Sequence, residues 1–373
     1  MTRDHLAPIV YIDGGLGTSL EDKYGVKFDE HTPLWSSHLL IDNPDTLREC
    51  QRDFGRIPVD ILLTATYQVS VEAFLSTKTA DYPNGIGRPE ISPFLDLAVS
   101  IAEEAKASTA RVALSLGPYG ASMIPSQEYS GRYDTEHNST DQLLDWHRDR
   151  LRLFEQIDRL GHRISYIAFE TVPRIDEIKA IRKVFSRTSS PNWSPSSITH
   201  GDVPFWISCV FPGDDYTLPD GSSVDQVVDA LLNPAYSENV PWGIGINCTK
   251  IAKIPELIRM YESAVSRLAS AGQLQEQPAL VLYPDGTNGE VYDTTTKTWH
   301  VPASQQAPTV SVMKTAFSSQ KAKCATSSRG SISLLTPSLT LAVSIAGEQS
   351  WLVAVASLLI VILLGFVLFF RDT

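Results

Sequence analysis

Basic residues and cysteines are both scarce in this chain of 373 residues. Its 31 Lys and Arg residues are outnumbered by 43 Asp and Glu residues, which gives a formal net charge of -12, and no basic stripe is present. This composition excludes the electrostatic footprint of a nucleic-acid-binding protein. The four cysteines, Cys50, Cys209, Cys248 and Cys324, are widely spaced and form no CxxC pair. Such spacing favours a reducing compartment over a disulfide framework.

Two further signatures are missing near the N-terminus. Residues 1–12 contain no long apolar stretch, so no secretory signal is predicted. No GxGxxG run opens a helix after the first predicted strand, which argues against a dinucleotide-dependent oxidoreductase. The content of 43% hydrophobic and 20% charged residues is ordinary for a globular protein that buries a sizeable core.

Short apolar segments alternate with amphipathic helical patterns along most of the chain. The segments are apolar throughout rather than alternating, as strands covered on both faces should be. Asn43 and Ser92 each precede a proline, which is typical of a helix start. The alternation predicts an α/β fold, specifically a (β/α)8 barrel rather than an open doubly wound sheet. The predicted strands are 9–13, 59–64, 111–116, 164–169, 204–210, 242–247 and 279–283.

The character of the sequence changes after Trp299. Ser, Thr, Ala, Gln and Lys dominate there without a strong period, which predicts a linker of low order and no normal eighth β/α unit. Residues 351–370 carry no charge and are long enough to cross a membrane as a helix, although a buried core helix is the alternative. We therefore expect a barrel over 1–299, a linker over 300–350 and a transmembrane helix over 351–370, anchoring a cytoplasmic barrel to a membrane.

Polar residues follow the predicted strands at the ends where a barrel carries its chemistry. Asp13 opens a glycine-rich turn after the first strand, Thr66 lies in a polar cluster after the second, Glu170 follows the fourth and Cys248 ends the sixth. Taken singly, they fit a tight turn, an acid at a helix start and a buried free cysteine. Because all of them fall at the same strand ends, a shared site is predicted, and the thiol indicates zinc or a sulfur-containing substrate.

Seven motifs occur in order along the chain: Asp13-Gly14-Gly15-Leu16-Gly17-Thr18, Leu34-Trp35-Ser36-Ser37, Thr66-Tyr67-Gln68, Gly117-Pro118-Tyr119-Gly120-Ala121, Glu128-Tyr129-Ser130-Gly131, Phe169-Glu170-Thr171 and Gly245-Ile246-Asn247-Cys248-Thr249. In order and spacing they resemble the homocysteine S-methyltransferase family over roughly residues 8–299. The resemblance implies a barrel enzyme that makes methionine. The methyl group would pass to homocysteine from a sulfonium donor, S-methylmethionine or S-adenosylmethionine.

The resemblance also implies a zinc site. In the family, zinc is bound by three cysteines, the first of which stands in the position of Cys248, and Asn247 would support the metal loop. The metal takes the homocysteine thiol as its fourth ligand and lowers the pKa of that thiol, so that a thiolate is present at neutral pH.

Five residues are implied to bind the substrate. By position in the motifs, Asp13 and Glu170 would hold the amino group of homocysteine. Gly14 and Thr66 would contact its carboxylate end, and Trp35 would line the pocket.

The sequence departs from the family pattern toward its C-terminus. The family carries its other two zinc ligands as an adjacent Cys-Cys pair after Gly-Gly, and this chain has no such pair. The only cysteine after Cys248 is Cys324, without glycines or an apolar strand before it. Two interpretations therefore stay open. One is a homocysteine S-methyltransferase, the active enzyme whose C-terminal sequence is altered here by an artefact of the gene model. The other is a catalytically impaired, membrane-tethered barrel that lost two zinc ligands. The sequence fixes neither the methyl donor nor the oligomeric state.

Overall fold

The computed structural model describes residues 9–29, 32–186, 203–274, 276–285, 291–293, 298–300 and 341–343. The chain divides into two compact units, one of residues 1–286 together with 339–373, and the other of residues 287–338. In the second unit the described residues form an antiparallel pair of strands, β8 (Val291–Asp293) and β9 (Thr298–His300). All other elements described below belong to the first unit.

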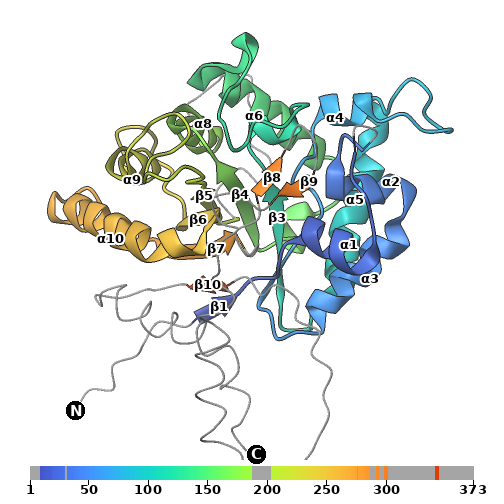
Figure 1. The fold of residues 1–373 in the computed structure, drawn as a ribbon, viewed down its shortest axis with the longest axis horizontal. Coiled ribbons are helices and arrows are strands. Elements are labelled where there is room, and N and C mark those ends of the chain that lie inside the picture. The colour runs from blue at the N-terminus through green and yellow to red at the C-terminus, as the bar shows by residue number, and fades with distance from the viewer. Residues whose placement is uncertain are drawn as a thin grey trace, which may run out of the picture. The chain divides into compact units, whose positions relative to one another are not determined.

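The first unit is built on a curled sheet whose strands β2 to β7 run parallel and pair in chain order (Figure 1). Strand β1 lies beside β2, because Ile12 and Ile61 form a parallel bridge and the Asp13 amide donates to the Ile61 carbonyl at 3.0 Å. The strands are β1 (Ile9–Tyr11), β2 (Ile61–Leu63), β3 (Arg111–Leu116), β4 (Tyr166–Val172), β5 (Phe205–Cys209), β6 (Gly243–Lys250) and β7 (Ala279–Asp285).

All seven predicted strands are present, and the α/β class is confirmed. Strands β4 and β6 run three residues further than predicted, so Glu170 and Cys248 lie within them. Among the described residues, the position between β7 and β1 is taken by β10 (Leu341–Val343), which pairs antiparallel with both neighbours. Strand β10 falls inside the range 300–350 that was predicted to be a linker.

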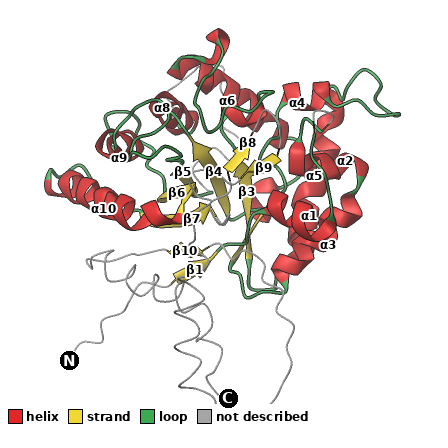
Figure 2. Ribbon diagram, in the orientation of Figure 1, coloured by secondary structure: helices red, strands yellow, loops and turns green. Residues whose placement is uncertain are grey.

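Helices follow the strands and lie around the sheet, as the red and yellow ribbons show (Figure 2). Consecutive long helices pack on one another, α3 on α5, α5 on α6, α6 on α8, α8 on α9 and α9 on α10. The α-helices are α1 (Leu16–Tyr24), α2 (Leu39–Asp42), α3 (Pro44–Gly55), α4 (Val71–Ser76), α5 (Arg88–Ala105), α6 (Thr140–Phe154), α7 (Leu160–Arg163), α8 (Ile175–Val184), α9 (Val224–Leu232) and α10 (Ile254–Ser270). Short 3-10 helices are η1 (Trp35–His38), η2 (Tyr119–Ser122), η3 (Thr135–His137) and η4 (Ile251–Lys253).

The two predicted helix starts have different outcomes. The side chain of Asn43 accepts a hydrogen bond from the Thr46 amide and caps α3, as predicted. The start at Ser92 is wrong, because α5 already begins at Arg88 and takes Pro89 in its first turn. Pro93 therefore lies inside α5.

Apolar side chains fill both faces of the sheet. The larger cluster lies between the strands and the helices, and it includes Leu62, Leu114 and Ile244. A second cluster gathers residues of successive strands around Trp206 and Tyr166. Because apolar packing around the strands disfavours polar groups, polar side chains collect where the parallel strands end.

Several predictions fall outside the described residues. These are the segment 351–370 predicted to span a membrane, Cys324, and the linker over 300–350 apart from His300 and β10. Within the part of the chain that the structure describes, no helix has both the length and the apolar character that a membrane crossing requires.

Candidate active site

Asp13 is a buried carboxylate with an unused oxygen. It follows β1 directly and is 6% exposed. Its Oδ2 accepts a hydrogen bond from the Leu63 amide at 2.9 Å, while Oδ1 is buried and has no hydrogen-bond partner among the described residues. Burial raises the pKa of Asp13 well above its usual value, and the nearby carboxylate of Glu170 adds to the effect. A buried oxygen of this kind is costly unless a ligand donates to it.

Glu170 lies near the end of β4, also 6% exposed. The Ser115 hydroxyl, from the neighbouring strand β3, donates to its Oε1, and the side chain of Tyr283 from β7 forms a second hydrogen bond. Burial raises the pKa of Glu170 to about 7. The two hydrogen bonds lower this pKa, but they offset only part of the effect of burial. Asp13 and Glu170, which the sequence placed at one site, are therefore close enough to interact electrostatically.

Asn247 and Cys248 are tied to the end of β4. Asn247 accepts from the Thr171 amide at 2.8 Å and donates to the Thr171 hydroxyl at 2.7 Å and to the Cys248 sulfur at 3.3 Å. The Thr171 hydroxyl also lies 3.7 Å from that sulfur. Burial raises the pKa of the Cys248 thiol to about 12, so the free thiol is protonated at neutral pH.

The backbone is strained at this point. Thr171 and Cys248 adopt φ angles of 59° and 47°, in the left-handed region that side chains with a Cβ rarely adopt. The register of β4 against β5 and of β6 against β7 shifts at the same two places. Strain of this kind persists only where surrounding contacts impose it, and it is concentrated at functional sites.

Thr66, Gly14 and Trp35 are the other three predicted residues. Thr66 is fully buried, and its hydroxyl donates to the Ser115 carbonyl at 2.8 Å. Gly14 lies in the turn between Asp13 and α1. Trp35, with φ of 45°, packs its indole so closely on Gly17 that a Cβ on this glycine would lie 2.8 Å from the ring. We refer to Asp13, Thr66, Ser115, Glu170, Thr171, Asn247 and Cys248 as the strand-end cluster.

A third buried acid, Glu128, was quoted in a motif but not predicted to act. It is 8% exposed, and its Oε2 accepts from the Tyr67 hydroxyl at 2.5 Å. Burial raises the pKa of Glu128 to about 7. Its neighbour Tyr129 forms a hydrogen bond with the thiol of Cys248. Glu128 lies on a loop rather than after a strand, so only its place in the motif Glu128-Tyr129-Ser130-Gly131 could have signalled it.

The metal site implied by the resemblance is not complete in the described residues. No group of three His, Cys, Asp or Glu side chains suited to a metal ion is found among them. Cys50 and Cys209 are buried in α3 and β5, and burial raises the pKa of each thiol. Cys248 therefore stands as a single sulfur in the strand-end cluster, and the described residues do not supply the other two cysteines of a three-cysteine zinc site.

Comparisons with known proteins agree with the motifs. The family model described as homocysteine S-methyltransferase matches residues 10–331. The chain is similar to homocysteine S-methyltransferase 1 of Arabidopsis thaliana, with 29% identity over 302 residues that cover 77% of this chain and 79% of that protein. It is also similar to betaine-homocysteine S-methyltransferase of Drosophila melanogaster, with 28% identity over 309 residues, 78% of this chain and 82% of the relative.

A solved structure supports the same assignment. The crystal structure of the homocysteine methyltransferase MmuM from Escherichia coli, in its metallated form, matches with a TM-score of 0.53 and 25% identity. The match covers 74% of this chain and 83% of that one. With the family model matched over most of the chain and the strand-end motifs in place, this protein belongs to the homocysteine S-methyltransferase family.

Proposed function

We propose that this protein transfers a methyl group from a positively charged donor to the thiol of homocysteine, forming methionine. The observation that carries the proposal is the pair of buried carboxylates, Asp13 and Glu170, with one Asp13 oxygen left without a partner among the described residues. An ammonium group donates three hydrogen bonds, and its positive charge complements the negative charge that both acids carry when ionised. The amino group of homocysteine meets this need.

The remaining contacts orient the amino acid. Gly14, at the turn before α1, is proposed to face the carboxylate of homocysteine together with Thr66. Because the Thr66 hydroxyl already donates to the Ser115 carbonyl, the backbone of the Gly14 turn is the better donor of the two. Trp35 is proposed to cover the apolar part of the substrate, and Asn247 to fix the loop that carries Cys248.

In the reaction, the homocysteine sulfur forms a bond to the methyl carbon as the bond between that carbon and the donor's onium atom breaks. The breaking bond leaves its electron pair on the donor, which departs as a neutral sulfide or amine, and the thiol proton is released. A free thiol has a pKa of about 8.5, so a minor fraction is thiolate near neutrality. The zinc implied by the family would raise that fraction, and Cys248 is the one residue of the strand-end cluster whose sulfur would bind it.

The methyl donor is proposed to be a sulfonium compound, S-methylmethionine or S-adenosylmethionine. The Drosophila relative is named for betaine, which carries a quaternary ammonium group instead. Both classes present a methyl group on a positively charged atom. The lack of an adjacent Cys-Cys pair in the sequence favours one other candidate, a protein that binds homocysteine without turnover.

One assay separates the two functions. The purified full chain is incubated with S-methylmethionine and with homocysteine labelled with carbon-13 in its carbon chain, and methionine is analysed by mass spectrometry. Methyl transfer predicts labelled methionine at a rate above that of the mixture without protein. Binding of homocysteine without labelled product would favour the protein without turnover, and absence of both would overturn the proposal.

A further inference from the structure

We propose that Glu128, together with the rings of Tyr67 and Tyr129, binds the positively charged methyl-bearing group of the donor. The proposal rests on the proposed function and deepens it, because it assigns the donor's charge to particular residues. None of the three was given a role by the sequence.

Glu128 is a carboxylate for which the described residues provide no countercharge. It is almost fully buried, and its partners among the described residues are the neutral hydroxyls of Tyr67 and Ser126. Burying an ionised carboxylate with neutral partners alone is costly, and the raised pKa of Glu128 reflects this cost. A cation bound beside it would offset the cost.

The charges of the strand-end cluster and of Glu128 leave room for a second positive group. Asp13, Glu170 and Glu128 are three buried acids, and the charge of Arg150 reaches Glu170. The Arg150 guanidinium is already bound to backbone, donating to the Gly117 carbonyl at 2.6 Å and the Tyr67 carbonyl at 3.0 Å. The ammonium of homocysteine supplies one positive charge, and the onium group of the donor supplies another.

Two tyrosine rings accompany the acid. Tyr67 donates its hydroxyl to Glu128, and its ring packs on Gly117, where a Cβ would lie 2.8 Å from the ring carbon Cζ. Tyr129 bonds to the Cys248 thiol through its hydroxyl, while the side chain as a whole remains 37% exposed. Aromatic faces beside a carboxylate are suited to methylated cations, because such cations are attracted to the ring faces. The bond from Tyr129 to Cys248 joins this group to the strand-end cluster.

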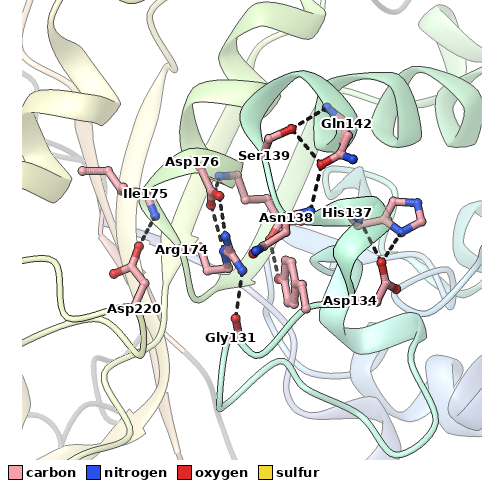
Figure 3. A network of polar contacts seen from close by, with 12 residues as sticks. Gly131, Asp134, His137, Asn138, Ser139, Gln142, Arg174, Ile175, Asp176 and Asp220 are labelled. Carbon is pink, nitrogen blue, oxygen red and sulfur yellow. Dashed lines mark hydrogen bonds and ion pairs between the residues drawn. The ribbon is translucent and has the colours of Figure 1, made fainter.

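The loop that carries Glu128 and Tyr129 is held in place. Arg174, just after β4, donates to the Gly131 carbonyl at 3.1 Å and is itself fixed by an ion pair with Asp176 (Figure 3). The same guanidinium lies 4.8 Å from the centre of the Tyr133 ring, whose hydroxyl donates to buried Glu177 at 2.5 Å. Glu128 is thus part of a formed structure rather than of a free loop.

The test compares two ligands that differ in charge. S-methylmethionine carries one methyl group and one positive charge more than methionine. We propose to measure both dissociation constants by calorimetry for the unaltered full chain, for Glu128→Gln and for Glu136→Gln. The last is a matched control, since Glu136 is exposed on the same segment.

The unaltered chain and Glu136→Gln are expected to prefer S-methylmethionine over methionine. Loss of one buried charged contact should reduce this preference about tenfold or more in Glu128→Gln. Homocysteine should bind all three proteins with affinities within about twofold, because Glu128 is not assigned to that substrate. An unaltered chain without the preference, or Glu128→Gln with the full preference, would overturn the proposal.

A second variant and a separate binding measurement complete the test. If Glu128→Gln fails to fold, Tyr129→Leu removes the exposed ring instead, and it should weaken S-methylmethionine binding severalfold while methionine binding is retained. Equal weakening of both ligands would count against the proposal. Homocysteine binding to the unaltered chain is a separate measurement, and its absence would overturn the proposed function independently of the charge preference.

Discussion

At the scale of single residues, the site consists of acids that the fold disfavours in their charged forms. Asp13, Glu128 and Glu170 are each less than a tenth exposed, and burial is the largest cause of the raised pKa of each. Burying these three carboxylates costs stability in the empty protein. Ligand cations would recover that cost, so the same feature that weakens the fold favours binding.

This unfavourable burial predicts a dependence of stability on pH. The pKa of Glu170 is raised from 4.5 to about 7, so between these values the unfolded chain has lost a proton that the folded chain still holds. The free energy of unfolding should therefore fall as pH rises from about 4.5 to 7, by up to about 3 kcal/mol for this group. Glu170→Gln, which still accepts from Ser115, should lack this part of the slope.

Urea unfolding at several pH values checks the prediction. The difference in free energy between Glu170→Gln and the unaltered chain should grow as pH rises through that window, with the variant the more stable at the upper end. A difference that stays constant with pH would show that Glu170 ionises normally in the folded protein.

Some of the site residues could be predicted from the sequence. Asp13, Glu170 and Cys248 could be predicted because each follows an apolar strand, and strand ends meet at one edge. Ser115 and Tyr283 could not be selected, since they lie within predicted strands and only pairing shows that they contact Glu170. Glu128 comes from a loop, whose position depends on contacts such as that of Arg174 with Gly131.

At the scale of elements, strands were predicted well and their ends less well. Apolar runs between turn signals locate β1 to β7, because strands buried on both faces must be apolar. The extensions of β4 and β6 depend on the contacts of Asn247 with Thr171 and on the left-handed residues there, which single-sequence patterns do not encode. The start of α5 was misplaced because Pro93 also fits a helix start, whereas Pro89 takes that position.

The pairing of β6 with β7 depends on Gly245. A Cβ at this residue would lie 2.2 Å from the Val281 carbonyl oxygen, which is backbone and cannot turn aside. Gly245→Ala should therefore force the two strands apart and lower the free energy of unfolding by about 3 kcal/mol or more. Gly213→Ala is the control, because its nearest neighbour is the Asp215 side chain, and it should cost less than about 1 kcal/mol.

Denaturant unfolding of both variants measures the two costs. Since β6 carries Asn247 and Cys248, we also expect Gly245→Ala to weaken homocysteine binding. A loss in Gly245→Ala no larger than in Gly213→Ala would contradict the close approach of these strands.

At the scale of the whole molecule, the parallel sheet β2 to β7 brings residues far apart in the sequence to one edge. The strand-end cluster draws on residues 13 to 248, so its geometry depends on the entire sheet. The fold class was predictable from the regular alternation of strands and helices. The pairing of β1 with the antiparallel β10 was not, because Leu341–Val343 is a short segment without a distinguishing pattern.

The proposed function depends on the binding of the amino group of homocysteine by the strand-end cluster. The most direct measurement is the dissociation constant of homocysteine, by calorimetry, for the full chain, for Asp13→Asn and for Asp53→Asn. Asp53 is a matched control, because it is a carboxylate of α3 that is paired with Lys23 and is not a member of the cluster. We predict that Asp13→Asn weakens binding by about tenfold or more while Asp53→Asn leaves it unchanged. Equal affinity of all three proteins for homocysteine would contradict the account.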